Sequence, residues 1–179
     1  MSPKAKASTT KKRGTTRNKS TPAKTPIKVF ISYSHKDTKL KEEFMDMLTG
    51  LEKQNVIQVW QDREIEPGDN WYRAIRSAMR SCEIAILLVS QNFLNSEFIE
   101  KEEVPKLLAK RKRQGMRVVP IILRPCLWKD DPVLSKIQAL PRDGRPIISI
   151  SRTQGRRDQA WLDIAQSIRR RAKLLQRNQ

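Results

Sequence analysis

Apolar positions along the chain recur in two patterns, one with helical spacing and one in short continuous runs. Leu40, Phe44, Met47 and Leu51 are separated by four, three and four positions, which predicts a helix that buries one face. Asp37 is expected to cap the start of this helix. Similar spacing predicts two more helices, one carrying Trp71, Ile75, Ala78 and Met79, the other carrying Trp161, Ile164, Ala165 and Ile168.

Five short runs rich in β-branched residues are predicted as strands, at residues 28–33, 56–60, 84–89, 118–123 and 146–150. The last three are largely continuous in apolar residues rather than alternating, which is typical of parallel strands covered on both faces. Strands and helices take turns, with an irregular segment over residues 125–145 in place of one helix. This order predicts an α/β fold with a five-stranded parallel sheet and helices on both faces. In a flavodoxin-like strand order the ligand-binding loops follow the first and third strands, and here they begin at Tyr33 and Ser90.

The first 26 residues differ in composition from the rest of the chain. They contain eight Lys or Arg, no Asp or Glu, and no large apolar residue beyond Met1, which predicts a disordered basic tail. We therefore expect a folded domain over residues 27–175 and a short C-terminal tail over residues 176–179. The tail has no apolar signal segment, and the longest apolar run is too short to cross a bilayer, so we expect a cytoplasmic protein without membrane contact.

The formal net charge is +18, and the basic tail carries eight of these positive charges. Such a charge allows a non-specific anionic partner, with the tail as its electrostatic anchor. The basic runs at residues 110–113 and 169–171 would form a phosphate-binding surface only if they faced the same way. Because the tail lacks interleaved aromatic residues, nucleic-acid binding is a third hypothesis rather than the main one.

Several kinds of enzyme site are unsupported by the sequence. His35 is the only histidine, and Cys82 and Cys126 lie far apart, so we expect no metal site, no catalytic triad and no disulfide. No GxGxxG or GxxxxGK[ST] motif occurs, which disfavours a typical dinucleotide fold or a P-loop enzyme.

Four glutamates crowd into residues 97–103, just before Pro105. Proline is tolerated best in the first turn of a helix, so we predict that this helix begins near residues 101–104. Its first glutamates would then lie at the positive end of the helix dipole, where each carboxylate gains about 0.3 to 1 kcal/mol. That gain alone is sufficient to explain Glu97, Glu100 and Glu102.

Four motifs occur in order along the chain: VFISYS at residues 29–34 with Asp37, VWQDREIEPGDNW at 59–71, LVSQNFLNSEF at 88–98, and VPIIL at 119–123. With these motifs the chain, from about residue 27 to 173, resembles a TIR (Toll/interleukin-1 receptor) domain of the prokaryotic type. The resemblance implies the same flavodoxin-like sheet that the apolar pattern predicts.

The resemblance implies two functions. Many TIR domains are adaptors that assemble with other TIR domains through the loop after the second strand, which here contains Arg63, Glu64, Ile65, Pro67 and Gly68. Others hydrolyse NAD+ at the nicotinamide–ribose bond, and a neighbouring subunit's loop completes the site. The family pattern that falls on Ser90, Phe93 and Ser96 assigns the catalytic glutamate to Glu103, with Glu102 as the near competitor.

We therefore expect an NAD+ glycohydrolase that is active as a homo-oligomer, with NAD+ as substrate and no further cofactor. A single carboxylate with an ordinary pKa of about 4.3 suffices, because it opposes the positive charge that develops on the ribose ring. Side chains that border the same loops are the candidate NAD+ contacts: Tyr33, Ser34, His35, Glu66, Trp71 and Ser90. Trp71 would stack on a ring of the ligand or, alternatively, begin the buried stripe of its helix. Ile99 departs from the aromatic residue that several active relatives carry one turn before the glutamate.

Overall fold

The computed structural model describes residues 25–60, 71–96 and 104–178. Its strands are β1 (Ile27–Ser32), β2 (Ile57–Trp60), β3 (Ile84–Val89) and β4 (Arg117–Ile122). Its α-helices are α1 (Thr38–Lys53), α2 (Trp71–Ser81), α3 (Gln91–Leu94), α4 (Val104–Gln114) and α5 (Arg156–Arg177). Short 3-10 turns are η1 (His35–Asp37), η4 (Leu134–Lys136), η5 (Ile147–Ser149) and η6 (Thr153–Gly155).

The strands form one parallel sheet in the order β2-β1-β3-β4. Every residue of β3 is buried, as its unbroken apolar sequence predicts for a strand covered on both faces. The chain moves from β1 to one side to form β2 and then returns past β1 to form β3. The predicted flavodoxin-like order and the α/β fold class are therefore confirmed.

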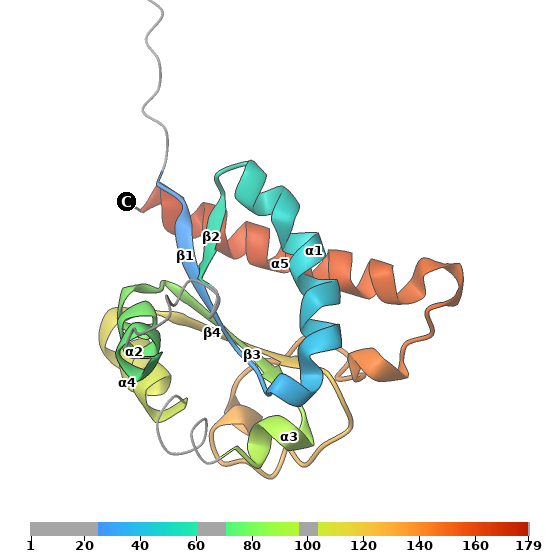
Figure 1. Ribbon diagram of the computed structural model, residues 1–179. Coiled ribbons are helices and arrows are strands. Elements are labelled where there is room, and N and C mark those ends of the chain that lie inside the picture. Colours follow the sequence, from blue (N-terminus) through green and yellow to red (C-terminus); the bar gives the residue numbers. More distant parts are fainter. Residues whose placement is uncertain (1–24, 61–70, 97–103, 179) are drawn as a thin grey trace, which may run out of the picture.

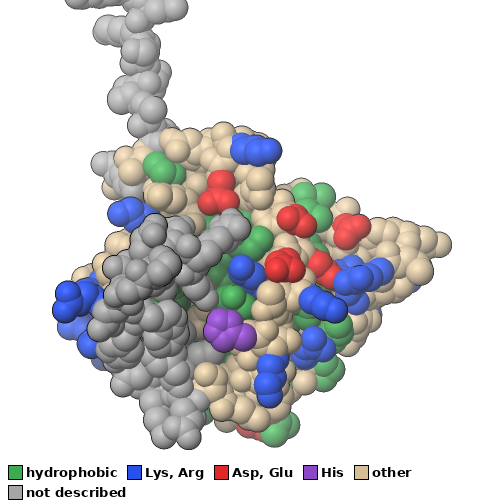
Figure 2. All heavy atoms as spheres, in the orientation of Figure 1, with side chains coloured by type: hydrophobic (Ala, Val, Ile, Leu, Met, Phe, Trp, Pro, Cys, Tyr) green, Lys and Arg blue, Asp and Glu red, His purple; other side chains and the backbone are tan. Residues whose placement is uncertain are grey.

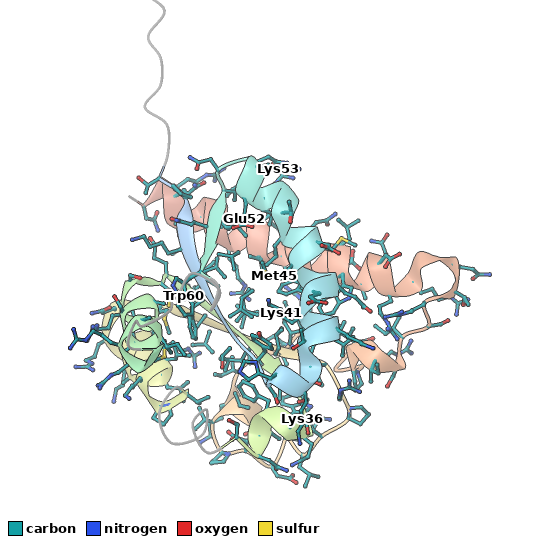
Figure 3. The ribbon with its side chains drawn as sticks, viewed as in Figure 1. Lys36, Lys41, Met45, Glu52, Lys53 and Trp60 are labelled. Atoms are coloured by element: carbon teal, nitrogen blue, oxygen red, sulfur yellow. The ribbon has the colours of Figure 1, made fainter. Side chains whose placement is uncertain are left out.

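Helices cover both faces of the sheet, as predicted: α1 and α5 lie on one side, and α2 and α4 on the other (Figure 1). Alternate residues of β1 serve the two layers, with Val29 facing α1 and α5 and Phe30 facing α2. The rings of Phe44 and Trp161 stack 5.1 Å apart between α1 and α5. Figure 3 shows Glu52 beside β2, where its carboxylate accepts a hydrogen bond of 3.0 Å from the Val59 N–H.

The predicted fifth strand, at residues 146–150, is wrong. The edge of β4 is instead occupied by Leu140, whose N–H donates to the Pro120 carbonyl and whose carbonyl accepts from the Ile122 N–H, both at 2.8 Å. The described residues thus contain a four-stranded sheet extended by a bridge of one residue.

A buried arginine explains why residues 146–150 do not form a strand. Arg157, at the start of α5, donates hydrogen bonds of 3.0 Å to the carbonyls of Ile148 and Ile150. These carbonyls bond the Arg157 side chain rather than a neighbouring strand, and Ile147–Ser149 form the turn η5. One backbone hydrogen bond of 2.9 Å, from the Ile148 N–H to the Leu123 carbonyl, still ties this turn to the end of β4. On α1, one carboxylate oxygen of Glu43 lies 3.7 Å from the Arg157 guanidinium. Its other oxygen accepts a hydrogen bond of 3.1 Å from the Trp161 indole N–H. These contacts join the turn to both helices.

The C-terminal helix continues to Arg177, two residues beyond the boundary expected at 175. The Gln176 amide donates to the Thr25 carbonyl at 3.0 Å, so the end of α5 lies beside the start of β1, as Figure 1 also shows. The predicted basic tail lies outside the described residues except for residues 25 and 26. Among the described helices, none combines the length and the apolar character needed to cross a membrane.

Candidate functional site

The candidate site lies at the carboxyl edge of the sheet, where the strand order reverses. β1 and β3 are adjacent, and their connections leave towards opposite sides of the sheet. The loops that follow them begin at Tyr33 and Ser90, as the sequence predicted. In open α/β folds ligands bind in the crevice at this switch point.

A polar cluster around a fully buried carboxylate joins three loops at this edge, and we call Asp37, Ser90 and Arg124 the switch-point cluster. The Ser90 hydroxyl donates to the Asp37 carboxylate at 2.5 Å, and the Arg124 Nε donates to its other oxygen at 2.7 Å. The Asp37 side chain is 0% exposed, whereas that of Arg124 is 39% exposed. Since the three residues follow β1, β3 and β4, the cluster fixes these loops relative to one another.

The expectation that Asp37 caps the first helix needs correction. Asp37 occupies the N-cap position of α1, but its side chain makes no capping hydrogen bond. Both carboxylate oxygens are taken by tertiary partners instead. Ser90, by contrast, does cap a helix, because its hydroxyl accepts from the Phe93 N–H at 3.1 Å at the start of α3.

Tyr33 and His35 form the accessible rim of the same edge. The half-buried Tyr33 ring meets the exposed His35 imidazole edge-on, with ring centroids 5.6 Å apart. On α1, the Lys41 ammonium lies 5.3 Å from the centre of the Tyr33 ring, a cation–π distance (Figure 3 labels Lys41). Ser34 is half-buried, and its carbonyl accepts from the Asp37 N–H at 2.7 Å. The edge therefore presents an aromatic ring flanked by polar groups.

Comparison with known proteins identifies the family. The family model described as "TIR domain" matches residues 29–170. The chain belongs to the TIR domain family. It is 36% identical over 144 residues to the uncharacterized protein y4lF of Sinorhizobium fredii, an alignment that covers 80% of this chain and 43% of y4lF. The chain thus spans less than half the length of this curated relative.

Two solved structures resemble this TIR domain. The first is the TIR domain of the Toll-related receptor TRR-2 from Hydra magnipapillata, with 20% identity, a TM-score of 0.44, and 58% of this chain and 78% of that one covered. The second is the set of TIR domains in the activated Roq1 resistosome that directly recognizes the pathogen effector XopQ. It has 18% identity, a TM-score of 0.49, and coverage of 78% and 84%.

The other site residues that the sequence predicts, or their side chains, lie outside the described part of this TIR domain. Glu66 and Glu103 lie outside the described residues, as do Arg63, Glu64, Ile65, Pro67 and Gly68 of the predicted interaction loop. Trp71 is the first residue of α2, and its side chain is also outside the description. In the described part of α4, Pro105 is the second residue, which agrees with its predicted place in the first turn. The proposed roles of all these residues stay predictions.

Asp37 and Arg124 are the site residues that the sequence reasoning missed as partners. The sequence presents Asp37 as a helix cap and as part of the first TIR motif, and gives Arg124 no role. A positional signal was present, since each lies within a few residues of the carboxyl end of a predicted strand. Their pairing across 87 positions, however, needs the sheet order.

The two cysteines offer no thiolate nucleophile to this TIR domain at neutral pH. Burial raises the pKa of the Cys82 thiol to about 11, against the opposing effect of the Lys110 ammonium. Burial also raises the pKa of Cys126, and the nearby Asp37 carboxylate acts in the same direction. Within the described ranges, His, Cys, Asp and Glu side chains form no cluster of three or more that could hold a metal ion.

Proposed function

We propose that this TIR domain is an NAD+ glycohydrolase that cleaves the nicotinamide–ribose bond when protomers associate. Family membership supports the proposal, because the TIR family includes such enzymes. The observation that carries it is the switch-point cluster, in which Asp37, Ser90 and Arg124 hold three loops at the edge where α/β folds bind nucleotides. When the loops of a site are already ordered before the substrate binds, less binding free energy is lost to ordering them.

Glu103 is the proposed catalytic residue of this reaction. The C–N bond breaks as its electron pair leaves with nicotinamide, which departs neutral because its ring is cationic in NAD+. Positive charge then spreads over the anomeric carbon and the ring oxygen, and a nearby carboxylate stabilises it. Water adds to that carbon and releases a proton, giving ADP-ribose. In sequence, Glu103 directly precedes Val104, the first described residue of α4.

Incubation of concentrated protein with NAD+, followed by measurement of free nicotinamide, tests the proposal. We expect release by the wild type and a loss of about 100-fold or more in Glu103→Gln, the cost typical of removing one group that stabilises transition-state charge. Glu102→Gln is the matched control, with the same change one position away, and should retain most activity. Equal rates for wild type and Glu103→Gln would refute the assignment.

The second candidate function is a non-catalytic TIR adaptor, which Ile99 favours because several active relatives carry an aromatic residue there. In that case no nicotinamide appears at any concentration, yet protomers still associate. Changing Glu64 to Lys and Pro67 to Ala in the loop should then abolish association measured by light scattering. Measuring both nicotinamide release and sedimentation on the same samples separates the two functions. In the enzyme, nicotinamide release rises as protomers associate, whereas the adaptor associates without any release.

A further inference from the structure

Arg124 is the member of the switch-point cluster that reaches the surface. Its side chain is 39% exposed, whereas that of Asp37 is 0% exposed. Ser90 is also buried, and its hydroxyl donates its only proton to Asp37 and accepts from the Phe93 N–H. A ligand that approaches this edge of the sheet therefore meets the Arg124 guanidinium before it meets the other two groups.

The Arg124 guanidinium is held through one nitrogen and keeps its other donors open. Arginine donates through Nε and through both Nη nitrogens. The Nε donor is used by the Asp37 carboxylate at 2.7 Å, and no residue in the described ranges accepts a hydrogen bond from either Nη nitrogen. Because the Nε bond ends on a buried carboxylate, it orients the planar group and leaves the Nη end for an acceptor from outside.

The position of Arg124 is that of a ligand contact in this class of fold. The Leu123 N–H donates to the Val89 carbonyl at 2.8 Å, which continues the pairing of β3 and β4 to the last residue before Arg124. Ser90 follows Val89 in the same way, and both side chains bond the same Asp37 carboxylate. The guanidinium thus lies at the carboxyl end of β3, beside the switch point where open α/β sheets bind nucleotides.

The loop after β1 adds positive charge to this edge. Residues 35–41 contain three lysines and one acid, the buried Asp37. Lys36 is exposed, and the Lys41 ammonium lies 5.3 Å from the centre of the Tyr33 ring; Figure 3 labels both lysines. Figure 2 shows the single histidine of the chain, in purple, on this face with blue side chains beside it. An anion that approaches the Nη groups of Arg124 is attracted by these charges.

We propose that Arg124 binds the diphosphate of NAD+, with Asp37 as the positioning residue that orients its guanidinium. A planar guanidinium with two open nitrogens matches two phosphate oxygens at once, which a lysine ammonium does not. The diphosphate carries the negative charge of NAD+ and joins its two ribose rings. Binding it therefore places the nicotinamide ribose for attack, as a substrate-positioning contact does. This inference rests on the proposed function for the identity of the ligand.

Binding of ADP and of adenosine to the isotope-labelled full chain, measured by NMR titration, tests this proposal. The two ligands differ only in the diphosphate, so the wild type should bind ADP about tenfold or more tightly than adenosine at moderate salt. Arg124→Gln should bind adenosine like the wild type but ADP about tenfold more weakly. The matched control, Arg117→Gln, removes the same charge from the exposed amino end of β4 and should keep the preference for ADP within about twofold.

Arg124→Lys separates a binding role from a structural one. Its ammonium replaces Nε as the partner of Asp37, so urea denaturation should resemble that of the wild type, yet no fork remains and the preference for ADP should fall about fivefold or more. Equal weakening of ADP and adenosine in Arg124→Gln would overturn the proposal, because Arg124 would then only hold the loops in place. So would an unchanged preference in Arg124→Lys, or an equal loss of preference in Arg117→Gln.

Binding of ADP needs no turnover, which keeps this test separate from that of the hydrolase. A wild type that prefers ADP but releases no nicotinamide from NAD+ would refute the enzyme and support the diphosphate contact. A wild type that releases nicotinamide but binds ADP no more tightly than adenosine would refute the role of Arg124 and leave the enzyme standing.

Discussion

The switch-point cluster and the cavity between α2 and α4 place positive charge in different surroundings. This cavity, the cationic groove, has a volume of about 550 Å³, and its two walls are α2 and α4. Its lining is Arg76, Met79, Arg80, Pro105, Lys106, Ala109, Lys110, Arg113 and Gln114. In the cluster, the fully buried Asp37 carboxylate is matched by the Ser90 hydroxyl and the Arg124 guanidinium. The described lining of the groove contains five cationic residues and no carboxylate. A charge removed from water needs a partner to replace its lost hydration, whereas an exposed charge keeps its hydration and needs none. The cluster is accordingly organised for rigidity, whereas Arg80 and Arg113, at the rim of the groove, are exposed and keep their hydration.

Lys110 stands between these two extremes. It lines the groove, yet its half-buried ammonium is satisfied by main-chain carbonyls at the end of α2. Removing a charged or polar group should therefore lower the free energy of unfolding most in the cluster, less in the wall of the groove, and least at its rim. The four predictions below follow that order.

The largest effect is expected from Asp37→Ala. The substitution leaves the Arg124 charge and the buried Ser90 hydroxyl without their shared partner, so the free energy of unfolding should fall by about 3 kcal/mol. Urea denaturation measures the loss. Asp46→Ala, at an exposed position of α1, is the control and should cost less than about 0.5 kcal/mol. Similar losses in both variants would break the comparison.

Alkaline pH should lower the free energy of unfolding through Cys82, which directly follows α2, one wall of the groove. Burial raises the pKa of this thiol from 9.0 to about 11, so the native state keeps a proton that the unfolded chain releases near pH 9. Stability contributed by the thiol is thus complete below pH 9 and declines up to about pH 11, by about 2 to 3 kcal/mol in all.

The test of this prediction compares unfolding of the wild type with that of Cys82→Ala between pH 8 and 11. Other groups titrate equally in both proteins, so the difference between the two curves isolates the thiol. The Cys82→Ala curve should be flatter over this range, while Cys126→Ala should keep the decline. Parallel curves for wild type and Cys82→Ala would contradict the assignment.

Lys110→Met should cost about 1 to 2 kcal/mol of unfolding free energy. The variant keeps the apolar stem but leaves carbonyls at the end of α2 without their charged donor. Lys112→Met on the same helix is exposed and should change stability by less than about 0.5 kcal/mol. An unchanged free energy of unfolding in Lys110→Met would mean that water replaces the ammonium, and that Lys110 does not hold α2 and α4 together.

The smallest effect on stability is expected at the rim. Arg80→Gln with Arg113→Gln should leave the unfolding free energy within about 0.5 kcal/mol of wild type, with any change a slight stabilisation at low salt because like charges are removed. Thermal unfolding at two salt concentrations measures this. A clear destabilisation would show that the rim arginines stabilise the fold, as the charged groups of the switch-point cluster do.

The parts of the fold that were predictable are those set by local pattern. β3 has the predicted limits, because six consecutive apolar residues specify a strand buried on both faces. The failed strand at residues 146–150 has a similar composition. What it lacked is a free hydrogen-bonding edge, since Leu140 takes the edge of β4 and Arg157 takes the carbonyls of Ile148 and Ile150.

The candidate site divides in the same way. The sequence by itself determined that loops after the first and third strands meet, and so placed Tyr33, Ser34 and Ser90 at one edge. Only the tertiary structure decided that Asp37 pairs with Ser90 and Arg124 rather than capping its own helix.

The basic runs show the division most clearly. Residues 110–113 and 169–171 belong to helices on opposite faces of the sheet, so they form no common surface, and α4 instead shares its cavity with the arginines of α2. Spacing along a chain determines which residues share a face of one helix or strand, because backbone geometry is local. Which faces meet depends on the order of the strands and on the side of the sheet that each helix covers, and packing of the whole core sets both.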